Sequence, residues 1–513
     1  MKQRAGHFKL AGSLALAVVI AITAGCSKGG GDAAQQPSTS ASAKPSVAPT
    51  QQQPVKISIM NTFYNAETPD KDSLEYKAVI EAYTNTKLEF TWVPSASYNE
   101  KLNVTLASGQ MPQVIMVSNL KNPNIVSTVR SGGFWEVGPY LKDYPNLKNL
   151  NPKLLDNMAI DGKVYGVYRS IALVRNGMIF RKDWLDNLGL KVPTTIDELY
   201  NVIKAFALND PDRNGLNDTY GIQIVKDLGD FKAMGAIFGV PNKWEVQNGA
   251  FTPAFMSKEY VEQLKFFKRL YDEKLMNQDF ALITVPQRDE AFYKGKFGMF
   301  YSATERVSVR EGLLKQNVPT GSLDLFSRVK GPKGEQNYAG SGFVGAFMFP
   351  KSAVKTEQEL RQILAFLDKL FDKPMQNLFQ YGIEGKDYKM ENGKANAKDP
   401  GAFHTELLTS MRLDPGDKAD PPLTFPAAET KSKEMNKKDE EIAVFDPSFP
   451  FISATFTEKG NELDQLINDA SVKYIIGKLD DAGWQATLEQ WKASGGTKVA
   501  EEFAQAYAKL QKK

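Results

Sequence analysis

Residues 55–60 (VKISIM), 87–93 (KLEFTWV) and 114–117 (VIMV) are the three stretches that decide the fold class. The first two alternate in polarity and all three are rich in β-branched or aromatic side chains, which predicts strands. Amphipathic stretches at 73–83 and 99–107 lie between them and predict helices. A strand–helix–strand–helix–strand order implies a parallel sheet with right-handed crossovers, so we expect an α/β protein.

The same patterns continue through the rest of the chain. The predicted helix at 257–274 is the clearest, because its apolar side chains recur at helical spacing on one face. The predicted strands are 161–168 and 341–349, and the predicted helices are 182–188, 196–207, 257–274, 285–293, 357–370, 461–475, 486–491 and 498–510.

Length and composition describe a folded globular protein. The chain has 513 residues, of which 42% are hydrophobic and 24% charged, and a chain of this length predicts about two to four domains. Apart from three basic residues within 1–25, the chain carries 60 basic and 60 acidic residues. A neutral body gives no electrostatic reason to expect a nucleic-acid partner. Separately, we expect the protein to be a monomer.

Cysteine and histidine are almost absent, which excludes several classes of chemistry. Cys26 is the only cysteine, so an internal disulfide or a cysteine-based zinc site is excluded. His7 and His404 are the only histidines, which argues against Ser–His–Asp triads and two-histidine metal centres. No stretch resembles a phosphate-binding loop or a nucleophile elbow, and we expect a binding protein rather than an enzyme.

The first 54 residues predict export and anchoring. Residues 1–9 are basic and 10–22 are apolar but too short to span a bilayer, which is typical of a signal peptide. Residues 23–26 (TAGC) resemble the lipobox of bacterial lipoproteins, so residues 1–25 would be removed and Cys26 would carry acyl chains such as palmitate. An ordinary secretory signal with an incidental cysteine is the alternative. Residues 26–54 then form the lipidated cysteine and a disordered, Ser/Thr/Ala/Gln/Pro-rich tether.

The body resembles the family 1 extracellular solute-binding proteins of ABC importers, the group that includes maltose-binding protein. The resemblance covers nearly all of residues 55–513 and rests on the order of several short strings. They are 107–112 (ASGQMP), 161–168 (DGKVYGVY), 180–190 (FRKDWLDNLGL), 192–195 (VPTT), 292–299 (FYKGKFGM), 380–388 (QYGIEGKDY) and 473–491. Long lipoprotein members from Gram-positive bacteria look most similar, which implies anchoring at the outer face of the cell membrane.

The resemblance implies a periplasmic-binding-protein-like fold with two α/β lobes, hinge strands and a ligand cleft between the lobes. The first lobe would comprise 55–170 and 342–370, and the second 177–340 and 371–513. Closure of the lobes would capture a solute, most simply an oligosaccharide, for delivery to ABC permease subunits. A receptor for a peptide or another solute, or a tethered sensor or adhesin with the same fold, remains an alternative.

Residues 210–221 (DPDRNGLNDTYG) predict a calcium loop. Oxygen ligands at alternate positions followed by a glycine suit the geometry that calcium requires. The loop also resembles the EF-hand-like calcium loop of some alginate-binding relatives, in which the metal is structural. The alternative is a solvated turn between two elements. The side chains of Asp210, Asp212, Asn214 and Asp218 and the carbonyl of Leu216 would be the ligands.

A second glycine motif, residues 340–345 (GSGFVG), matches G-x-G-x-x-G. Dinucleotide binding requires a helix that begins at these glycines. Here the motif lies inside an apolar run that ends at Pro350, so we interpret it as a hinge strand.

The ligand cleft is inferred from the maltose-binding pattern and from aromatic residues near strand ends. Sugar clefts need aromatic faces and surrounding polar groups, and Arg169 and Arg175 could pair with a carboxylate on a charged sugar. For each aromatic residue, a place in a lobe core is the alternative, which we favour for Trp184 and Trp491. The predicted cleft residues are Asn61, Tyr64, Ser118, Asn119, Trp135, Tyr168, Arg169, Trp244, Tyr301 and Ser302.

Overall fold

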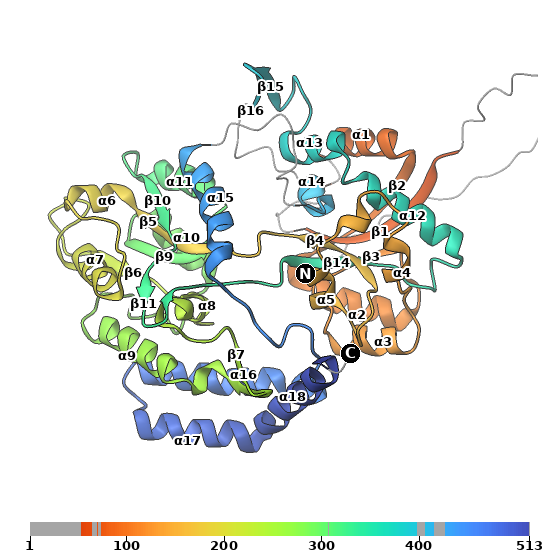
Figure 1. Ribbon diagram of the computed structural model, residues 1–513. Helices are drawn as coiled ribbons and strands as arrows, with labels where there is room; N and C mark the ends of the chain where they lie inside the picture. Colours follow the sequence, from red (N-terminus) through yellow and green to blue (C-terminus); the bar gives the residue numbers. More distant parts are fainter. Residues whose placement is uncertain are drawn as a thin grey trace, which may run out of the picture. The chain divides into compact units, whose positions relative to one another are not determined.

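The fold is described from a computed structural model of the chain (Figure 1). The structure describes residues 53–63, 69, 73–305, 307–397, 406–414 and 426–511. The predicted signal peptide, Cys26 and almost all of the predicted tether lie outside these residues. Within the described ranges, no helix is both long enough and apolar enough to cross a membrane.

The first sheet has five strands in the order β2-β1-β3-β14-β4. The strands predicted at 55–60, 87–93 and 114–117 form β1, β2 and β3, and they pair in parallel, as the alternation with helices predicted. β14 runs antiparallel to both β3 and β4. The strands are β1 (Val55–Phe63), β2 (Thr86–Pro94), β3 (Val114–Val117), β4 (Gly166–Ser170) and β14 (Phe343–Met348).

Burial follows strand position in this sheet. β3 lies in the middle, and all four of its side chains are buried, which explains its unbroken apolar run. β2 is an edge strand, and Leu88 is buried while its neighbours Lys87 and Glu89 are exposed. The helices around this sheet are α1 (Leu74–Thr84), α2 (Tyr98–Ser108), α3 (Pro123–Arg130), α4 (Gly138–Leu141), α5 (Pro152–Met158), α12 (Glu357–Lys369), α13 (Lys373–Tyr381) and α14 (Glu406–Met411).

The first core extends further along the chain than the sequence predicted. Met375 and Phe379 of α13, Leu408 and Met411 of α14, and Leu413 beyond it, are almost fully buried in the core of the first lobe. The assignment of every residue after 370 to the second lobe is therefore wrong for this stretch. The amphipathic pattern indicates that these helices bury one face, but it does not specify which lobe receives that face.

The second sheet has four strands in the order β10-β5-β9-β6. β5 pairs antiparallel with both β10 and β9, and β6 runs parallel to β9. The strands are β5 (Asn176–Arg181), β6 (Tyr220–Ile222), β9 (Phe297–Ala303) and β10 (Leu323–Phe326). Short ribbons elsewhere are β7 (Trp244–Gln247) with β8 (Ala250–Pro253), β11 (Lys330–Gly331) with β12 (Gly334–Glu335), β13 (Asn337–Tyr338) with β17 (Ala443–Val444), and β15 (Tyr388–Glu391) with β16 (Lys394–Ala397).

Helices with well-defined N-termini surround the second sheet. Thr195 and Ser257 accept hydrogen bonds from the first turns of α7 and α9, and Thr284 begins α10 with a capping box. Trp184 and Trp491 lie in this core, as predicted. The helices are α6 (Lys182–Asn187), α7 (Ile196–Leu208), α8 (Gly229–Ala233), α9 (Lys258–Asp272), α10 (Val285–Tyr293), α11 (Val307–Asn317), α15 (Ala427–Asp439), α16 (Ala454–Ile475), α17 (Asp481–Trp491) and α18 (Thr497–Gln511).

Three segments carry the chain between the two lobes. Residues 171–175 join β4 to β5, residues 339–342 join β13 to β14, and the chain between α14 and α15 is described only in part. The first two segments are hydrogen-bonded to each other, from Ile171 N to Gly342 O and from Gly340 N to Leu173 O. They therefore form one ribbon that both lobes share.

A buried polar cluster, the junction network, ties these segments together on the side of the second lobe. The Asn337 amide donates hydrogen bonds to the Asn176 carbonyl (2.8 Å) and to the Asp439 carboxylate (3.1 Å), and accepts one from the Tyr301 hydroxyl (2.9 Å). Asn337 stands on β13, Asn176 begins β5 and Asp439 ends α15. The network thus joins the start of β5 and the strand β13, which flank the shared ribbon, to the end of α15.

Candidate ligand site

The directions of the strands identify the edge of each sheet that adjoins the crossing segments. β1, β2, β3 and β4 all run the same way, and the chain leaves the first lobe at the carboxyl end of β4. In the second sheet, β6, β9 and β10 end at the edge where β5 begins. Sheets of α/β proteins bind ligands beyond the carboxyl ends of their strands, so these two edges form the candidate ligand site.

On the first lobe, this edge carries small polar side chains. Ser118 and Asn119 follow β3 directly and are exposed. The Thr62 hydroxyl, near the end of β1, is buried and has no hydrogen-bond partner in the part of the chain that the structure describes. A buried polar atom without a partner is costly and requires an explanation, such as a ligand or a water molecule.

The second lobe contributes polar side chains of its own at the facing strand edge. The side-chain oxygen of Gln223, directly after β6, is also buried without a partner among the described residues. Ser302 is half-buried on β9, and next to it the guanidinium of Arg175 forms a two-point ion pair with Glu305 at 2.8 and 3.0 Å. Arg175 and Glu305 are each about one-third exposed, at 34% and 32%.

Thr62 and Gln223 were not among the predicted site residues. Gln223 is the one polar side chain in the apolar run at 221–225 (GIQIV), and Thr62 lies where β1 ends. A polar residue within an apolar strand is the sequence signal that could have identified Gln223. Whether such a residue can reach a ligand depends on which edge of the sheet the strand end occupies. The sequence does not show which edge this is.

Asn61 and Arg169 do not belong to the accessible edge. Both are buried, and both donate hydrogen bonds to main-chain carbonyls at or beyond the end of α14, Asn61 to Ser410 and Arg169 to Thr409 and Arg412. They fasten α14 over the end of the sheet. The prediction that Arg169 would pair with a carboxylate on the ligand is therefore not supported.

Tyr168 and Tyr301 are likewise interior residues, not ligand platforms. The Tyr168 hydroxyl accepts a hydrogen bond from Asn151 N at 2.7 Å, and burial raises its pKa to about 12. The Tyr301 hydroxyl donates to Asn337 within the junction network, and burial raises its pKa above the ordinary value. Only 3% and 2% of the two residues is exposed, so the predicted cleft role of both is wrong.

The two predicted tryptophans also lie elsewhere. Trp135 N donates to Phe349 O and its indole donates to Val354 O, both beyond the carboxyl end of β14. Because β14 is antiparallel to β3, this is the edge opposite the crossing segments. Trp244 packs against Phe251, Trp491 and Phe503 within the second lobe. Tyr64 lies outside the described residues.

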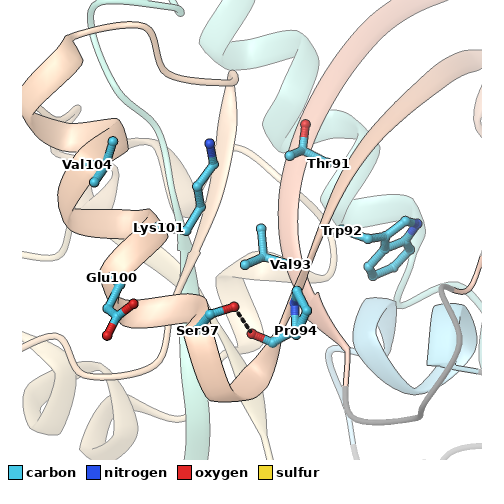
Figure 2. Close-up of a pocket in the computed structure, with 8 residues that line it drawn as sticks. All are labelled: Thr91, Trp92, Val93, Pro94, Ser97, Glu100, Lys101 and Val104. Carbon is cyan, nitrogen blue, oxygen red and sulfur yellow. Dashed lines mark hydrogen bonds between the residues drawn. The ribbon is translucent and has the colours of Figure 1, made fainter. Parts of the chain in front are cut away.

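A cavity of about 410 Å³ lies at the carboxyl end of β2, on the flank of the candidate site. Figure 2 shows Glu100 and Lys101 on α2 and Trp92 projecting from the strand on the side away from that helix. Trp92 also stacks on Phe90, with ring centroids 4.7 Å apart. The lining offers hydroxyl, carboxylate and ammonium groups that could bind sugar hydroxyls, while the Trp92 ring projects to the other side of the strand. The lining residues are Thr91, Trp92, Val93, Pro94, Ser97, Glu100, Lys101 and Val104.

The predicted calcium loop folds around the side chain of Asn214. Its amide nitrogen lies 3.0 Å from a carboxylate oxygen of Asp212 and 3.2 Å from one of Asp218. The Asp210 carboxylate accepts hydrogen bonds from the main-chain nitrogens of Asn214 and Gly215. Burial, with the neighbouring carboxylates of Asp210 and Asp218, raises the pKa of Asp212.

The donor atoms of this loop fit a hard cation, although the side chains are not gathered into a finished metal cluster. Within the described ranges, no three His, Cys, Asp or Glu side chains lie close enough together to hold a metal ion. However, one carboxylate oxygen of Asp212 is buried with no partner in the same ranges. An orphaned, buried carboxylate oxygen beside an amide and two further carboxylates matches the all-oxygen ligand set of calcium.

The glycines of 340–345 serve the backbone, not a phosphate. Gly342 has φ +81°, and an added Cβ would lie 2.8 Å from Leu154. Gly345 lies against Met116 and Val117, where a Cβ would be 2.5 Å from the nearest atoms. β14, not a helix, begins at Phe343, so the hinge-strand interpretation agrees with the structure.

The bacterial extracellular solute-binding protein family matches residues 65–376 of the chain, which is more than half of it. The chain belongs to this family. The family and its relatives bind solutes rather than convert them, which confirms the prediction of a binding protein, and their two-lobe α/β fold confirms the predicted fold class.

Two curated relatives of this solute-binding protein come from Bacillus subtilis (strain 168). The polygalacturonan/rhamnogalacturonan-binding protein YtcQ is 38% identical over 460 residues, covering 88% of this chain and 91% of the relative. Lipoprotein LipO is also 38% identical, over 470 residues, covering 88% and 92%. Among solved structures, an extracellular solute-binding protein from Bifidobacterium longum subsp. infantis has a TM-score of 0.67 at 18% identity, covering 89% of this chain and 98% of its own.

The hydrogen bond from Tyr301 to Asn337 should stabilise this solute-binding protein. Tyr301→Phe should lower the free energy of unfolding by about 1–2 kcal/mol, because the buried oxygen of Asn337 loses its donor. Urea denaturation would measure the change. Tyr83→Phe is the matched control, since its hydroxyl donates to Asp372 at the surface and its loss should cost little. Unchanged stability in Tyr301→Phe together with lost solute binding would restore Tyr301 as a ligand residue.

Proposed function

We propose that this extracellular solute-binding protein captures an acidic oligosaccharide for an ABC importer by closing its two lobes. The substrate class is an oligosaccharide with uronic acid residues, of the polygalacturonan type. Neutral polar groups at the two strand edges would bind the hydroxyl groups of the sugar. The guanidinium of Arg175 beside them would bind its carboxylates. Permease subunits would then receive the captured sugar.

The ion pair of Arg175 and Glu305 is the observation that carries the charge specificity. Arg175 belongs to a crossing segment and Glu305 follows β9, so the pair lies where the two strand edges meet the ribbon. A planar guanidinium binds carboxylates at two points, and a uronate presents the same group as Glu305. Because one-third of Arg175 is exposed, a sugar carboxylate can reach it without unfolding the site.

The sequence relationship supports the same class of solute. YtcQ binds polygalacturonan and rhamnogalacturonan by its name, and the similarity covers 88% of the present chain. Polygalacturonan is a polymer of uronic acids, which gives a guanidinium at the lobe junction an evident role. The proposal for this chain rests on the Arg175 pair and on that resemblance together.

Calorimetric titration would test the substrate class. Oligogalacturonates should bind, and neutral oligosaccharides of equal length should bind more weakly. Arg175→Gln should weaken oligogalacturonate binding roughly ten- to a hundredfold, the value of one charge-assisted pair, and leave neutral sugars unaffected. Higher salt should reduce the difference between wild type and variant.

Arg130→Gln is the matched control for this experiment. Arg130 forms the same two-point ion pair with Asp161, but it stands at the end of α3, away from the strand edges of the site. Its loss should leave sugar binding unchanged. Binding of peptides alone, or equal binding of acidic and neutral sugars by wild type, would contradict the proposal.

We also propose that residues 210–218 bind a structural calcium ion through the side chains of Asp210, Asp212, Asn214 and Asp218 and the carbonyl of Leu216. The ion would supply positive charge where the loop holds three carboxylates. We expect an affinity of about 10⁻⁴–10⁻³ M, as in extracellular modules. The loop connects α7 to β6, so calcium would stabilise the second lobe and not contact the solute.

Asp212→Asn should separate two effects of this carboxylate, which are its cost to stability without metal and its contribution to calcium binding. The raised pKa of Asp212 means that its ionised form destabilises the folded chain, a cost absent well below pH 4 and fully present at neutral pH. In chelator at pH 7, the variant should therefore melt at the same or a higher temperature than wild type. With calcium, wild type should melt higher and the variant should not respond. Identical wild-type melts in calcium and chelator would contradict the calcium proposal.

Membrane attachment through Cys26 completes the proposal. LipO is named a lipoprotein, and residues 23–26 have the order expected for lipid attachment. Cys26→Ser should move the protein from the membrane fraction to the medium, because acyl chains provide the anchor. Solute affinity should not change, since the candidate site begins beyond residue 55. Retention of the variant on membranes would show that another surface holds it there.

A further inference from the structure

Lys296 places an ammonium group on the last acidic position of the 210–218 loop. Its Nζ donates to a carboxylate oxygen of Asp218 at 2.8 Å. Among the ion pairs of the described residues, this is the only one that involves Asp210, Asp212 or Asp218. The ammonium group therefore neutralises one of the carboxylates that a bound cation would use.

The main chain holds Lys296 in this position. Tyr220 N donates to Lys296 O at 3.0 Å, and Lys296 N donates to Ala291 O at 3.0 Å. Tyr220 begins β6, two residues after Asp218, and Lys296 directly precedes β9. The parallel pairing of β6 with β9 thus fixes the root of the lysine beside the end of the loop.

The charges of the loop explain why a lysine here matters. Asp218 accepts hydrogen bonds from Lys296 and from the Asn214 amide. Among the ion pairs of the described residues, none reaches Asp210 or Asp212. The loop's own cation, Arg213, donates to the Asn187 carbonyl instead, so Lys296 supplies the positive charge that is paired with the three carboxylates.

We propose that Lys296 is a tethered competitor of calcium, which partly neutralises the loop without metal and must leave Asp218 when calcium binds. This inference rests on the proposed calcium site and deepens it. It explains how the loop can keep its fold at low calcium, and it predicts that the lysine weakens the affinity of the loop for the metal.

The expected effect is modest, because the pair is partly solvated. The exposed fractions of the Lys296 and Asp218 side chains are 54% and 35%. Surface pairs and unit charges a few ångströms apart in water interact by an amount equivalent to roughly a three- to tenfold change in an equilibrium constant. Removal of the lysine charge should therefore tighten calcium binding by about this factor.

Lys296→Met tests the inference in the full-length protein with calcium as the probe. In chelator, the variant should melt at a lower temperature than wild type, because the three carboxylates lose their neutralising charge. Calorimetric titration should show calcium binding about three- to tenfold tighter than in wild type, and 0.5 M sodium chloride should reduce that advantage. A purely structural role for the lysine would lower stability without improving calcium affinity.

Lys294→Met is the matched control. Lys294 directly follows α10, two residues before Lys296, and pairs with Glu290 at the surface with similar exposure. Its removal changes the net charge equally but should leave calcium affinity unchanged. Lys296→Arg keeps the charge and should bind calcium as weakly as wild type.

The outcomes separate this inference from the calcium proposal itself. If wild type binds calcium and Lys296→Met binds it no more tightly, the inference is wrong and the calcium site stands. If neither protein binds calcium at millimolar concentrations, both are wrong. Binding by the variant alone would support the competition and correct the affinity proposed for wild type.

Discussion

The carboxylate of Asp439 is the charge on which the arrangement of the crossing segments depends. Its side chain is fully buried and is held by the Arg328 guanidinium at 3.0 Å and the Asn337 amide at 3.1 Å. A buried carboxylate that lost these partners would cost several kcal/mol. The end of α15, the strand β13 and the start of β5 must therefore stay together for this charge to remain satisfied.

This constraint determines where the molecule can bend. The crossing segments are fastened to the second lobe by the junction network and by Asn242, which donates to the carbonyls of Ala339 and Val444. Toward the first lobe the same ribbon contains Gly340 and Gly342, the latter with a positive φ. Bending is therefore expected next to the first lobe. The Arg175 pair lies on the fastened side, so closure would bring the first-lobe edge to a charge that stays in place.

The sequence was sufficient to predict the helices and strands and their order. It was less sufficient for predicting which residues form the site. Alternating polarity identified β1 and β2, and helical periodicity identified α7, α9 and α12 to within a few residues. The sequence did not show in the same way which side of its strand each aromatic side chain faces. Tyr168 and Tyr301 stand on strands whose neighbours bury them. Trp135 follows α3, which carries the chain from the end of β3 to the opposite edge of the sheet. Likewise, the return of α13 and α14 to the first core is a tertiary choice that local pattern does not encode.

Small-angle X-ray scattering on the folded body, with and without a saturating oligogalacturonate, tests whether an acidic sugar closes the two lobes. Saturation would be established beforehand by calorimetry on the same sample. Closure of the lobes should give a smaller radius of gyration with the acidic oligosaccharide, and a neutral one of the same length should cause no change. An unchanged radius of gyration at saturating oligogalacturonate would contradict capture by closure.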